Sequence, residues 1–230
     1  MEIFGVNIAG IKPEHSLNEL IKLISVEKRN KIKSYRKKED YLRSLTAELL
    51  IRVILVKKGL FQNEDIQFEY NNYGKPLLKN SSIKFNISHS GDWVVCAVSN
   101  FLVGIDIEEI RSYNVSAIKD SLTANEFNTL IDLSKNDRST FFFNLWTLKE
   151  SYIKAVGKGL SIPLKSISFE MNDNEIIFTN RYNNDTFNFK QYEIDNRYKL
   201  SVCNEKTSFP KEICIWSFHK LYHDSINLLK

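Results

Sequence analysis

Two short segments of the chain place acids and a lysine at spacings suited to metal and phosphate chemistry. Asp106 and Glu108 are two residues apart in an apolar segment, and Glu150 and Lys154 are four apart in a segment of helical pattern. Residues two apart on a strand face the same side, and residues i and i+4 of a helix are neighbours. Carboxylates suit a hard cation such as Mg²⁺, which often completes its coordination with substrate phosphate. These residues therefore predict a divalent-metal and phosphate centre.

Each pair also has an ordinary explanation. The two strand carboxylates could lie at a solvated strand end, because Glu109 and Arg111 follow directly. Glu150 and Lys154 could form an exposed ion pair worth about 0.3–0.5 kcal/mol. Against this, Trp146 falls on the same helix face as the charged pair, while leucines form a separate apolar face. A large aromatic residue beside charges is more typical of a cleft wall than of an open surface.

A basic run early in the sequence could bind anionic groups. Eight lysines and arginines lie between Lys28 and Arg43, opposed only by Glu39 and Asp40. Lys28 and Lys31 are one helical turn apart, so they can address the same anion. A solvated helix face is the alternative.

Lys75, Ser88 and His89 are further candidates for phosphate contacts. Lys75 lies between Gly74 and Pro76, in a turn-forming segment. Ser88 and His89 lie at a predicted junction of strand and turn, where a hydroxyl and an imidazole can donate to phosphate. The alternative for His89 is that it only stabilises its turn. No Walker A, GxGxxG, HExxH or EF-hand pattern is present, and no Ser-His-Asp triad can be argued from the four histidines.

The pattern around these residues predicts an α+β protein. We expect helices at 25–35, 39–58 and 141–156, strands at 3–8, 66–70, 83–88, 93–99 and 102–108, and a meander of short strands over 166–202. The segments 47–52 and 149–154 each contain an acid, an isoleucine and a base four residues after the acid. This internal echo suggests two related α+β lobes, although such short matches also arise by chance.

The composition fits a folded protein without a large excess of charge. The 230 residues carry 32 Lys and Arg against 28 Asp and Glu, a net charge of +4, which does not require a nucleic-acid partner. Cys96, Cys203 and Cys214 form no CxxC pair, which argues against a disulfide framework or a zinc site and favours a reducing cytoplasm. No signal-peptide pattern is visible, and the aliphatic stretch 49–56 contains Arg52 and is too short to span a membrane.

Four motifs, taken in order, resemble those of the 4′-phosphopantetheinyl transferases of the large, Sfp type. They are Tyr73 to Pro76 (YGKP), Phe85 to Ser90 (FNISHS), Val103 to Glu108 (VGIDIE) and Phe143 through Leu160. The basic segments 28–31 and 38–43 also resemble this family, so the similarity extends over most of the chain. A single GIDIE would be weak evidence, whereas four motifs in the right order and spacing are strong evidence.

The resemblance implies a fold and a reaction. The fold would be two similar α/β lobes in a pseudo-twofold arrangement, residues 1–103 and 104–230, with the active site in the cleft between them. The enzyme would move the 4′-phosphopantetheine arm of coenzyme A onto a serine of an acyl- or peptidyl-carrier protein, with Mg²⁺ or alternatively Mn²⁺, releasing adenosine 3′,5′-bisphosphate. We expect an acidic carrier protein as partner, no nucleic acid and no membrane, and a monomer, because one chain would supply both halves of the site.

The resemblance also assigns roles to residues that match the family's motifs. Asp106, Glu108 and Glu150 would bind the metal, which would hold the pyrophosphate of coenzyme A. Glu150 would also be the base for the incoming serine, directly or through a water, and Lys154 would neutralise the departing phosphate. Glu126 would contact the metal through water. The coenzyme A site would be lined by Lys28, Lys31, Ser44, Lys75, Pro76, Ser88, His89 and Lys154.

Other functions fit parts of the pattern. Another Mg²⁺-dependent phosphate enzyme, such as a nucleotide hydrolase, would use the same carboxylates with water as nucleophile, and would release phosphate or pyrophosphate without modifying a protein. A basic nucleic-acid-binding protein would use the 28–43 cluster and bind with a strong salt dependence, but would leave the three acids unexplained. A family member that binds coenzyme A without catalysis is disfavoured, because none of the expected catalytic positions is substituted.

Overall fold

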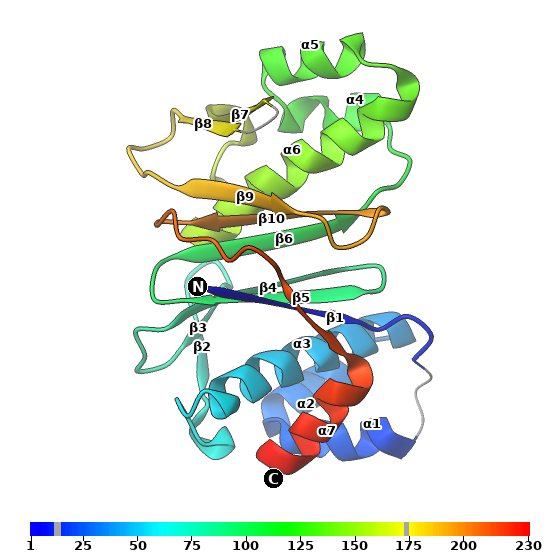
Figure 1. Cartoon of the computed structure of the whole chain (residues 1–230), viewed down its shortest axis with the longest axis vertical. Helices are drawn as coiled ribbons and strands as arrows, with labels where there is room; N and C mark the ends of the chain where they lie inside the picture. The colour runs from blue at the N-terminus through cyan, green and yellow to red at the C-terminus, as the bar shows by residue number, and fades with distance from the viewer. Residues whose placement is uncertain (12–14, 173–174) are drawn as a thin grey trace.

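The computed structural model describes residues 1–11, 15–172 and 175–230, and its centre is formed by two neighbouring sheets (Figure 1). One sheet has the order β11-β1-β5-β4, with β1 (Glu2–Asn7), β4 (Lys84–Ser90), β5 (Trp93–Ser99) and β11 (Cys214–Ser217). The other has the order β6-β10-β9, with β6 (Val103–Glu109), β9 (Asn188–Tyr192) and β10 (Tyr198–Asn204). Two separate hairpins are β2 (Phe68–Tyr70) with β3 (Pro76–Leu78) and β7 (Ile167–Asn172) with β8 (Glu175–Asn180).

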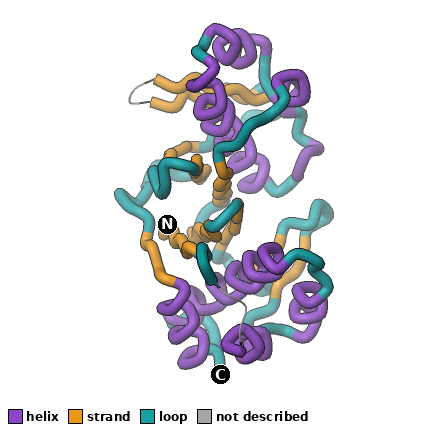
Figure 2. Tube along the Cα trace, turned by 90° about the vertical axis from the view of Figure 1, so that its right-hand side faces the viewer, coloured by secondary structure: helices purple, strands orange, loops and turns teal. Residues whose placement is uncertain are grey.

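Helices lie on the outer side of each sheet. They are α1 (His15–Leu20), α2 (Val26–Lys33), α3 (Lys38–Lys57), α4 (Val115–Ile118), α5 (Ala124–Asp132), α6 (Lys135–Val156) and α7 (Phe218–Leu228). In Figure 1, α1, α2, α3 and α7 lie below the four-stranded sheet, and α6 lies above the three-stranded sheet. Figure 2, turned by 90°, shows helices at both ends and strands between them. The prediction of an α+β fold is confirmed.

The sequence of β5 explains why the four-stranded sheet lies inside the molecule. Every residue of this strand is buried, as expected for an apolar run that is covered on both faces. Val94 and Cys96 face the core shared with α3, whereas Val95 and Ala97 face a second core that also contains Ile105 of β6. The alternation of side chains along one strand thus joins helix to sheet and sheet to sheet.

The last elements of the chain return to the first sheet. β11 pairs in parallel with β1, with Phe4 opposite Cys214, and Leu221 of α7 is buried in the same core as α3. Residues 214–228, which the sequence-based division places in the second lobe, therefore pack on the first sheet and its helices. The physical reason is that β1 would otherwise present an open edge of N–H and C=O groups. The boundary between residues 103 and 104 stays a prediction.

Several other elements differ from the sequence-based expectation. α6 begins at Lys135, earlier than predicted, because Ser134 caps a polar first turn that no apolar pattern marks. His89 and Ser90 belong to β4 rather than to the turn of the hairpin. The meander expected over 166–202 is divided between the β7–β8 hairpin and the three-stranded sheet, and residues 173 and 174 of this range lie outside the described part. In the described ranges, no helix combines the length and apolar character needed to cross a bilayer.

α6 packs directly on β6 at Gly104. A Cβ atom at this position would lie 1.9 Å from the carbonyl oxygen of Ser151 and 2.5 Å from the backbone nitrogen of Ala155. Glycine is therefore required for the close approach of strand and helix backbones. This approach brings one face of α6 beside the carboxylates of β6.

We predict that Gly104→Ala lowers the free energy of unfolding by about 1–3 kcal/mol, because overpacking forces a rigid helix backbone away from the strand. Urea denaturation followed by tryptophan fluorescence measures the change. Gly5→Ala is the matched control, since the atoms nearest its Cβ would be side-chain rather than backbone atoms, with Ile215 Cδ1 at 3.0 Å and Ile194 Cδ1 at 3.2 Å. Equal losses in the two variants would contradict the special role of Gly104.

Candidate active site

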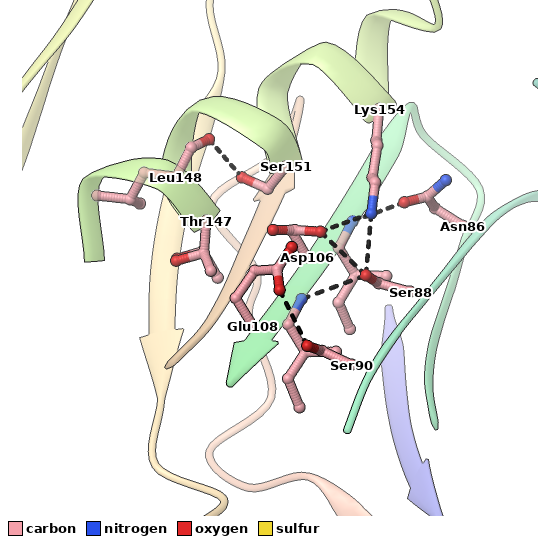
Figure 3. Close-up of polar contacts among 12 residues, drawn as sticks. Asn86, Ser88, Ser90, Asp106, Glu108, Thr147, Leu148, Ser151 and Lys154 are labelled. Atoms are coloured by element: carbon pink, nitrogen blue, oxygen red, sulfur yellow. Dashed lines mark hydrogen bonds and ion pairs between the residues drawn. The ribbon is translucent and has the colours of Figure 1, made fainter. Parts of the chain in front are cut away.

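β4 and β6 lie side by side at the boundary between the two sheets and are joined by side chains (Figure 3). Asn86, Ser88 and Ser90 alternate along β4, so they share one face of the strand. Their side-chain oxygens accept hydrogen bonds over 2.9, 3.3 and 3.1 Å from the backbone N–H groups of alternate β6 residues, namely Ile105, Ile107 and Glu109. We call these three contacts the polar ladder. The ladder fixes the register of β6 against β4.

The two serines of the ladder also hold the carboxylates of β6. Ser88 Oγ donates to Asp106 Oδ1 over 2.9 Å, and Ser90 Oγ donates to Glu108 Oε2 over 2.9 Å. Each hydroxyl therefore both accepts a bond from a β6 backbone N–H and donates one to a β6 carboxylate, which uses both capacities of the group. As a result, both carboxylates are oriented by the neighbouring sheet rather than by their own strand alone (Figure 3).

α6 contributes the remaining charged groups. Lys154 Nζ lies 2.5 Å from Asp106 Oδ1 and donates to Ser88 Oγ over 2.9 Å. Glu150 and Trp146, on the same face of this helix, line a cavity of about 300 Å³ together with both carboxylates of β6 and Lys154. The full lining is Ile87, Ser88, His89, Asp106, Glu108, Trp146, Glu150, Lys154 and Leu160. The structure thus brings all four predicted metal and catalytic residues to one cavity.

A second cavity of about 280 Å³ adjoins the first and shares Ile87, Glu150, Lys154 and Leu160 with it. Its other walls include the turn around Gly74 and the end of α6. Together the two cavities form an elongated space that runs from the β6 carboxylates to that turn. Such a shape suits a long substrate with its charged part beside the acids.

Burial raises the pKa values of all three carboxyl groups, and repulsion by Asp106 adds to the shift in Glu108 and Glu150. Burial raises the pKa of Asp106, although the Lys154 ammonium opposes the shift. Burial and then the Asp106 charge raise the pKa of Glu108, and the same two causes raise the pKa of Glu150 to about 7. The site therefore concentrates negative charge that one lysine does not balance, and this is a property of cation sites and of general bases.

The donor atoms of the site suit a divalent cation, but two of the acids are already engaged. Asp106 Oδ2 is buried and has no hydrogen-bond partner among the described residues, so this oxygen is available as a ligand. As arranged, however, no three acidic, histidine or cysteine side chains within the described ranges converge closely enough to hold a metal ion. In addition, Lys154 and Ser90 engage oxygens of Asp106 and Glu108. The predicted metal role of Asp106, Glu108 and Glu150 therefore stays a prediction.

Comparison with known proteins identifies the family. A family model described as the 4′-phosphopantetheinyl transferase superfamily matches residues 102–203, and one described as 4′-phosphopantetheinyl transferase, N-terminal, matches residues 12–101. The chain is 33% identical to the 4′-phosphopantetheinyl transferase Sfp of Bacillus subtilis (strain 168) over 223 residues, which cover 96% of this chain and 100% of that protein. This chain belongs to the 4′-phosphopantetheinyl transferase superfamily.

The chain also resembles a further 4′-phosphopantetheinyl transferase and a solved synthase structure. The 4′-phosphopantetheinyl transferase gsp of Aneurinibacillus migulanus is 38% identical over 204 residues, covering 89% of this chain and 86% of that protein. A holo-(acyl-carrier-protein) synthase from Bacillus anthracis str. Ames, solved in complex with CoA (3′,5′-ADP), aligns with 44% of this chain and 92% of its own, at 22% identity and a TM-score of 0.40. The family suggested by the motifs of the sequence is confirmed.

Glu126 lies in a buried ion pair with Lys149. It is buried, and its Oε2 lies 2.8 Å from Lys149 Nζ and accepts the Thr123 N–H, while its Oε1 accepts the Phe169 N–H. Lys149 is fully buried and also donates to the carbonyl groups of Leu164 and Ile167. Both oxygens of Glu126 are thus engaged in this ion pair and its surrounding hydrogen bonds, and the expected water-mediated contact with a metal stays a prediction.

The residues expected to line the coenzyme A site are only partly brought together. Pro76, Ser88, His89 and Lys154 line one or other of the two cavities, and so does Lys75. Neither cavity is lined by the other three, which are Lys28, Lys31 and Ser44. These three come from α2 and α3. Their roles stay predictions.

Two of the basic residues are already engaged. Lys28 Nζ lies 3.6 Å from Glu48 Oε2, and the Lys75 ammonium donates to the carbonyl oxygen of Ala155 over 2.8 Å. Both side chains would have to leave these partners to meet a phosphate. The sequence could not indicate this, because Glu48 and Ala155 lie 20 and more residues away.

Sequence reasoning missed the functions of Asn86, Ser90 and Gly104. All three fall within motifs of this superfamily, but their roles depend on the neighbouring sheet or helix rather than on the segment itself. A signal was present, since Asn86, Ser88 and Ser90 form a polar stripe of period two on a strand whose other face carries Phe85 and Ile87.

We predict that Ser90→Ala weakens binding of Mn²⁺, used as a paramagnetic probe, about 10- to 100-fold, as expected when a group that orients a metal ligand is lost. Removal of the hydroxyl frees Glu108 Oε2 and leaves the Glu109 N–H without its acceptor. Electron paramagnetic resonance titration measures the affinity. Ser90→Thr keeps the hydroxyl and serves as the control; if Ser90→Ala binds as tightly as Ser90→Thr, the ladder does not orient the ligand.

We predict that Lys149→Met lowers the free energy of unfolding by about 3–5 kcal/mol, because it leaves a buried carboxylate without its cation. Glu126→Gln added to Lys149→Met removes that charge and restores part of the loss. Urea denaturation of the wild type, both single variants and the double variant gives the coupling free energy. Strictly additive losses would contradict a direct Lys149–Glu126 ion pair.

Proposed function

We propose that this protein transfers the 4′-phosphopantetheine arm of coenzyme A to a serine hydroxyl of an acyl- or peptidyl-carrier protein and releases adenosine 3′,5′-bisphosphate. The observation that carries the proposal is the convergence of Asp106, Glu108, Glu150 and Lys154 on one cavity at the boundary between the sheets. Relatives that align over nearly the whole chain are named 4′-phosphopantetheinyl transferases. Phosphoryl transfer requires positioning and charge neutralisation rather than a covalent intermediate on the protein, and the cavity offers both.

Each charged group has a proposed role in the transfer. A divalent cation held by Asp106 Oδ2, Glu108 and Glu150 would neutralise pyrophosphate charge. Glu150, whose pKa is raised to about 7, accepts the proton of the serine hydroxyl, directly or through a water. The serine oxygen then forms a bond to the β-phosphorus as the bond to the bridging oxygen breaks. Lys154 moves from Asp106 to the phosphate that leaves.

The remaining partners follow from the surroundings of the cavity and from the relatives. The B. anthracis synthase was solved in complex with CoA (3′,5′-ADP), and we extend coenzyme A to this chain as the donor. Lys28, Lys31 and His89 are proposed to bind its phosphates, and Mn²⁺ to replace Mg²⁺.

An acidic carrier protein would be attracted by the excess of basic residues. The free cysteines suit a reducing cytoplasm, and we propose a monomer that acts without nucleic acid or membrane.

The proposal is tested by intact-protein mass spectrometry of an apo peptidyl-carrier protein incubated with this protein, coenzyme A and Mg²⁺. We expect a gain of about 340 Da, one phosphopantetheine group attached covalently, which disappears with EDTA. Glu150→Gln should reduce turnover by about 10²-fold or more, as expected for loss of a general base, while coenzyme A binding measured by calorimetry changes little.

Two controls separate this reaction from its alternatives. Phosphate or pyrophosphate released without any modified protein would favour a nucleotide hydrolase over a transferase. Failure to modify several different apo carriers, together with no binding of coenzyme A, would overturn the proposal. If Glu150→Gln turns over as fast as wild type, the proposed transfer reaction still stands, but Glu150 is not its base.

A further inference from the structure

The turn between β2 and β3 reaches the end of α6. The Lys75 ammonium donates to the carbonyl oxygen of Ala155 over 2.8 Å and lies 3.4 Å from that of Val103, at the start of β6. Asn71 Nδ2 donates to the carbonyl oxygen of Gly157 over 2.7 Å. Two side chains of one turn therefore bind the last turn of the helix that carries Glu150 and Lys154.

The end of α6 needs such partners. The last four carbonyl groups of a helix have no N–H partner within the helix, so they need hydrogen-bond donors from elsewhere. The negative end of the helix dipole, which lies at the same end, attracts a cation. Ala155 is among these last residues, because α6 ends at Val156 and Gly157 is the left-handed cap with φ +75°. The Lys75 ammonium supplies both the hydrogen bond and the charge. Burial lowers the pKa of Lys75 to about 8, in keeping with an ammonium enclosed by protein.

The contact is closely packed and preorganised. A Cβ at Gly157 would lie 2.7 Å from Lys75 Cδ and 3.1 Å from Asn71 Nδ2, so a larger residue there would displace these two side chains. Asn71 Oδ1 accepts the N–H groups of Tyr73 and Lys75, each over 2.9 Å. The same amide group thus shapes the turn with its oxygen and holds the helix with its nitrogen.

We propose that Lys75 and Asn71 are positioning residues: they fix the last turn of α6, and with it Lys154, and the Lys75 ammonium acts on helix carbonyl groups rather than on a phosphate of coenzyme A. The kinetic part of this inference rests on the proposed transferase function. Lys154 precedes Ala155 directly in the sequence, so a shift of this turn moves the Lys154 ammonium relative to Asp106. Loss of the contact then slows turnover without weakening substrate binding.

Lys75→Met keeps most of the aliphatic stem and removes the ammonium. We expect kcat to fall about tenfold, with the KM for coenzyme A and its salt dependence within about twofold of wild type. Lys79→Met is the matched control, because Lys79 is an exposed lysine just beyond β3 and loses the same charge. A rise in the KM for coenzyme A with unchanged kcat would overturn the proposal and make Lys75 a phosphate ligand.

Asn71→Asp provides an independent second variant. Aspartate keeps the oxygen that accepts the Tyr73 and Lys75 N–H groups but cannot donate to Gly157. We expect the same loss of kcat at unchanged KM. The double variant with Lys75→Met and Asn71→Asp should have a kcat no more than about twofold below that of Lys75→Met alone. Wild-type kinetics in Asn71→Asp, or fully multiplicative losses in the double variant, would count against one shared contact.

Hydrogen exchange measured by mass spectrometry separates this inference from the proposed function. We expect Lys75→Met and Asn71→Asp to exchange amides in the last turn of α6 at least tenfold faster than wild type and Lys79→Met, with α3 unchanged. This result is independent of transferase activity, so it supports the contact even if no carrier protein is modified. Unchanged exchange in both variants would overturn it.

Discussion

The arrangement of the site depends on the fact that β4 and β6 are bridged by side chains instead of a backbone ladder. Three short polar residues of β4 satisfy alternate N–H groups of β6, and two of them also hold a carboxylate (Figure 3). An unsatisfied buried N–H group costs about 1–3 kcal/mol, so apolar residues at these positions would destabilise the boundary. The same hydroxyls that join the sheets therefore orient Asp106 and Glu108.

This arrangement has an electrostatic consequence. Three carboxyl groups share one partly buried space with a single lysine, and burial raises the pKa of each. The pKa of Glu150 rises from 4.5 to about 7 in the folded protein. Destabilisation of the folded state therefore begins as the pH rises above the pKa that Glu150 has in the unfolded chain, and it is complete above the pKa that Glu150 has in the folded protein. At neutral pH the site therefore favours any ligand that brings positive charge. Lys154 meets part of this requirement by pairing with Asp106.

The sequence predicted the long helices, the β4–β5 hairpin and the convergence of Asp106, Glu108, Glu150 and Lys154, because each depends on a local pattern or a family motif. It could not predict contacts between distant segments. β11 pairs with β1 across almost the whole chain, and no local pattern selects that edge. Lys149 stands beside Glu150 in the sequence, yet one is fully buried with Glu126 while the other lines a cavity, since neighbouring helical residues point about 100° apart.

The two halves of the chain contribute different kinds of group to the site. The four residues proposed for chemistry lie on β6 and α6, which Gly104 holds in direct contact. The first half supplies the groups that position them, through the polar ladder on one side and through Asn71 and Lys75 on the other. Serine and asparagine lose little rotamer entropy when fixed, so they suit the ladder. The longer Lys75 side chain suits a reach across the boundary, where its hydrogen bond to the Ala155 carbonyl oxygen offsets part of the rotamer entropy lost.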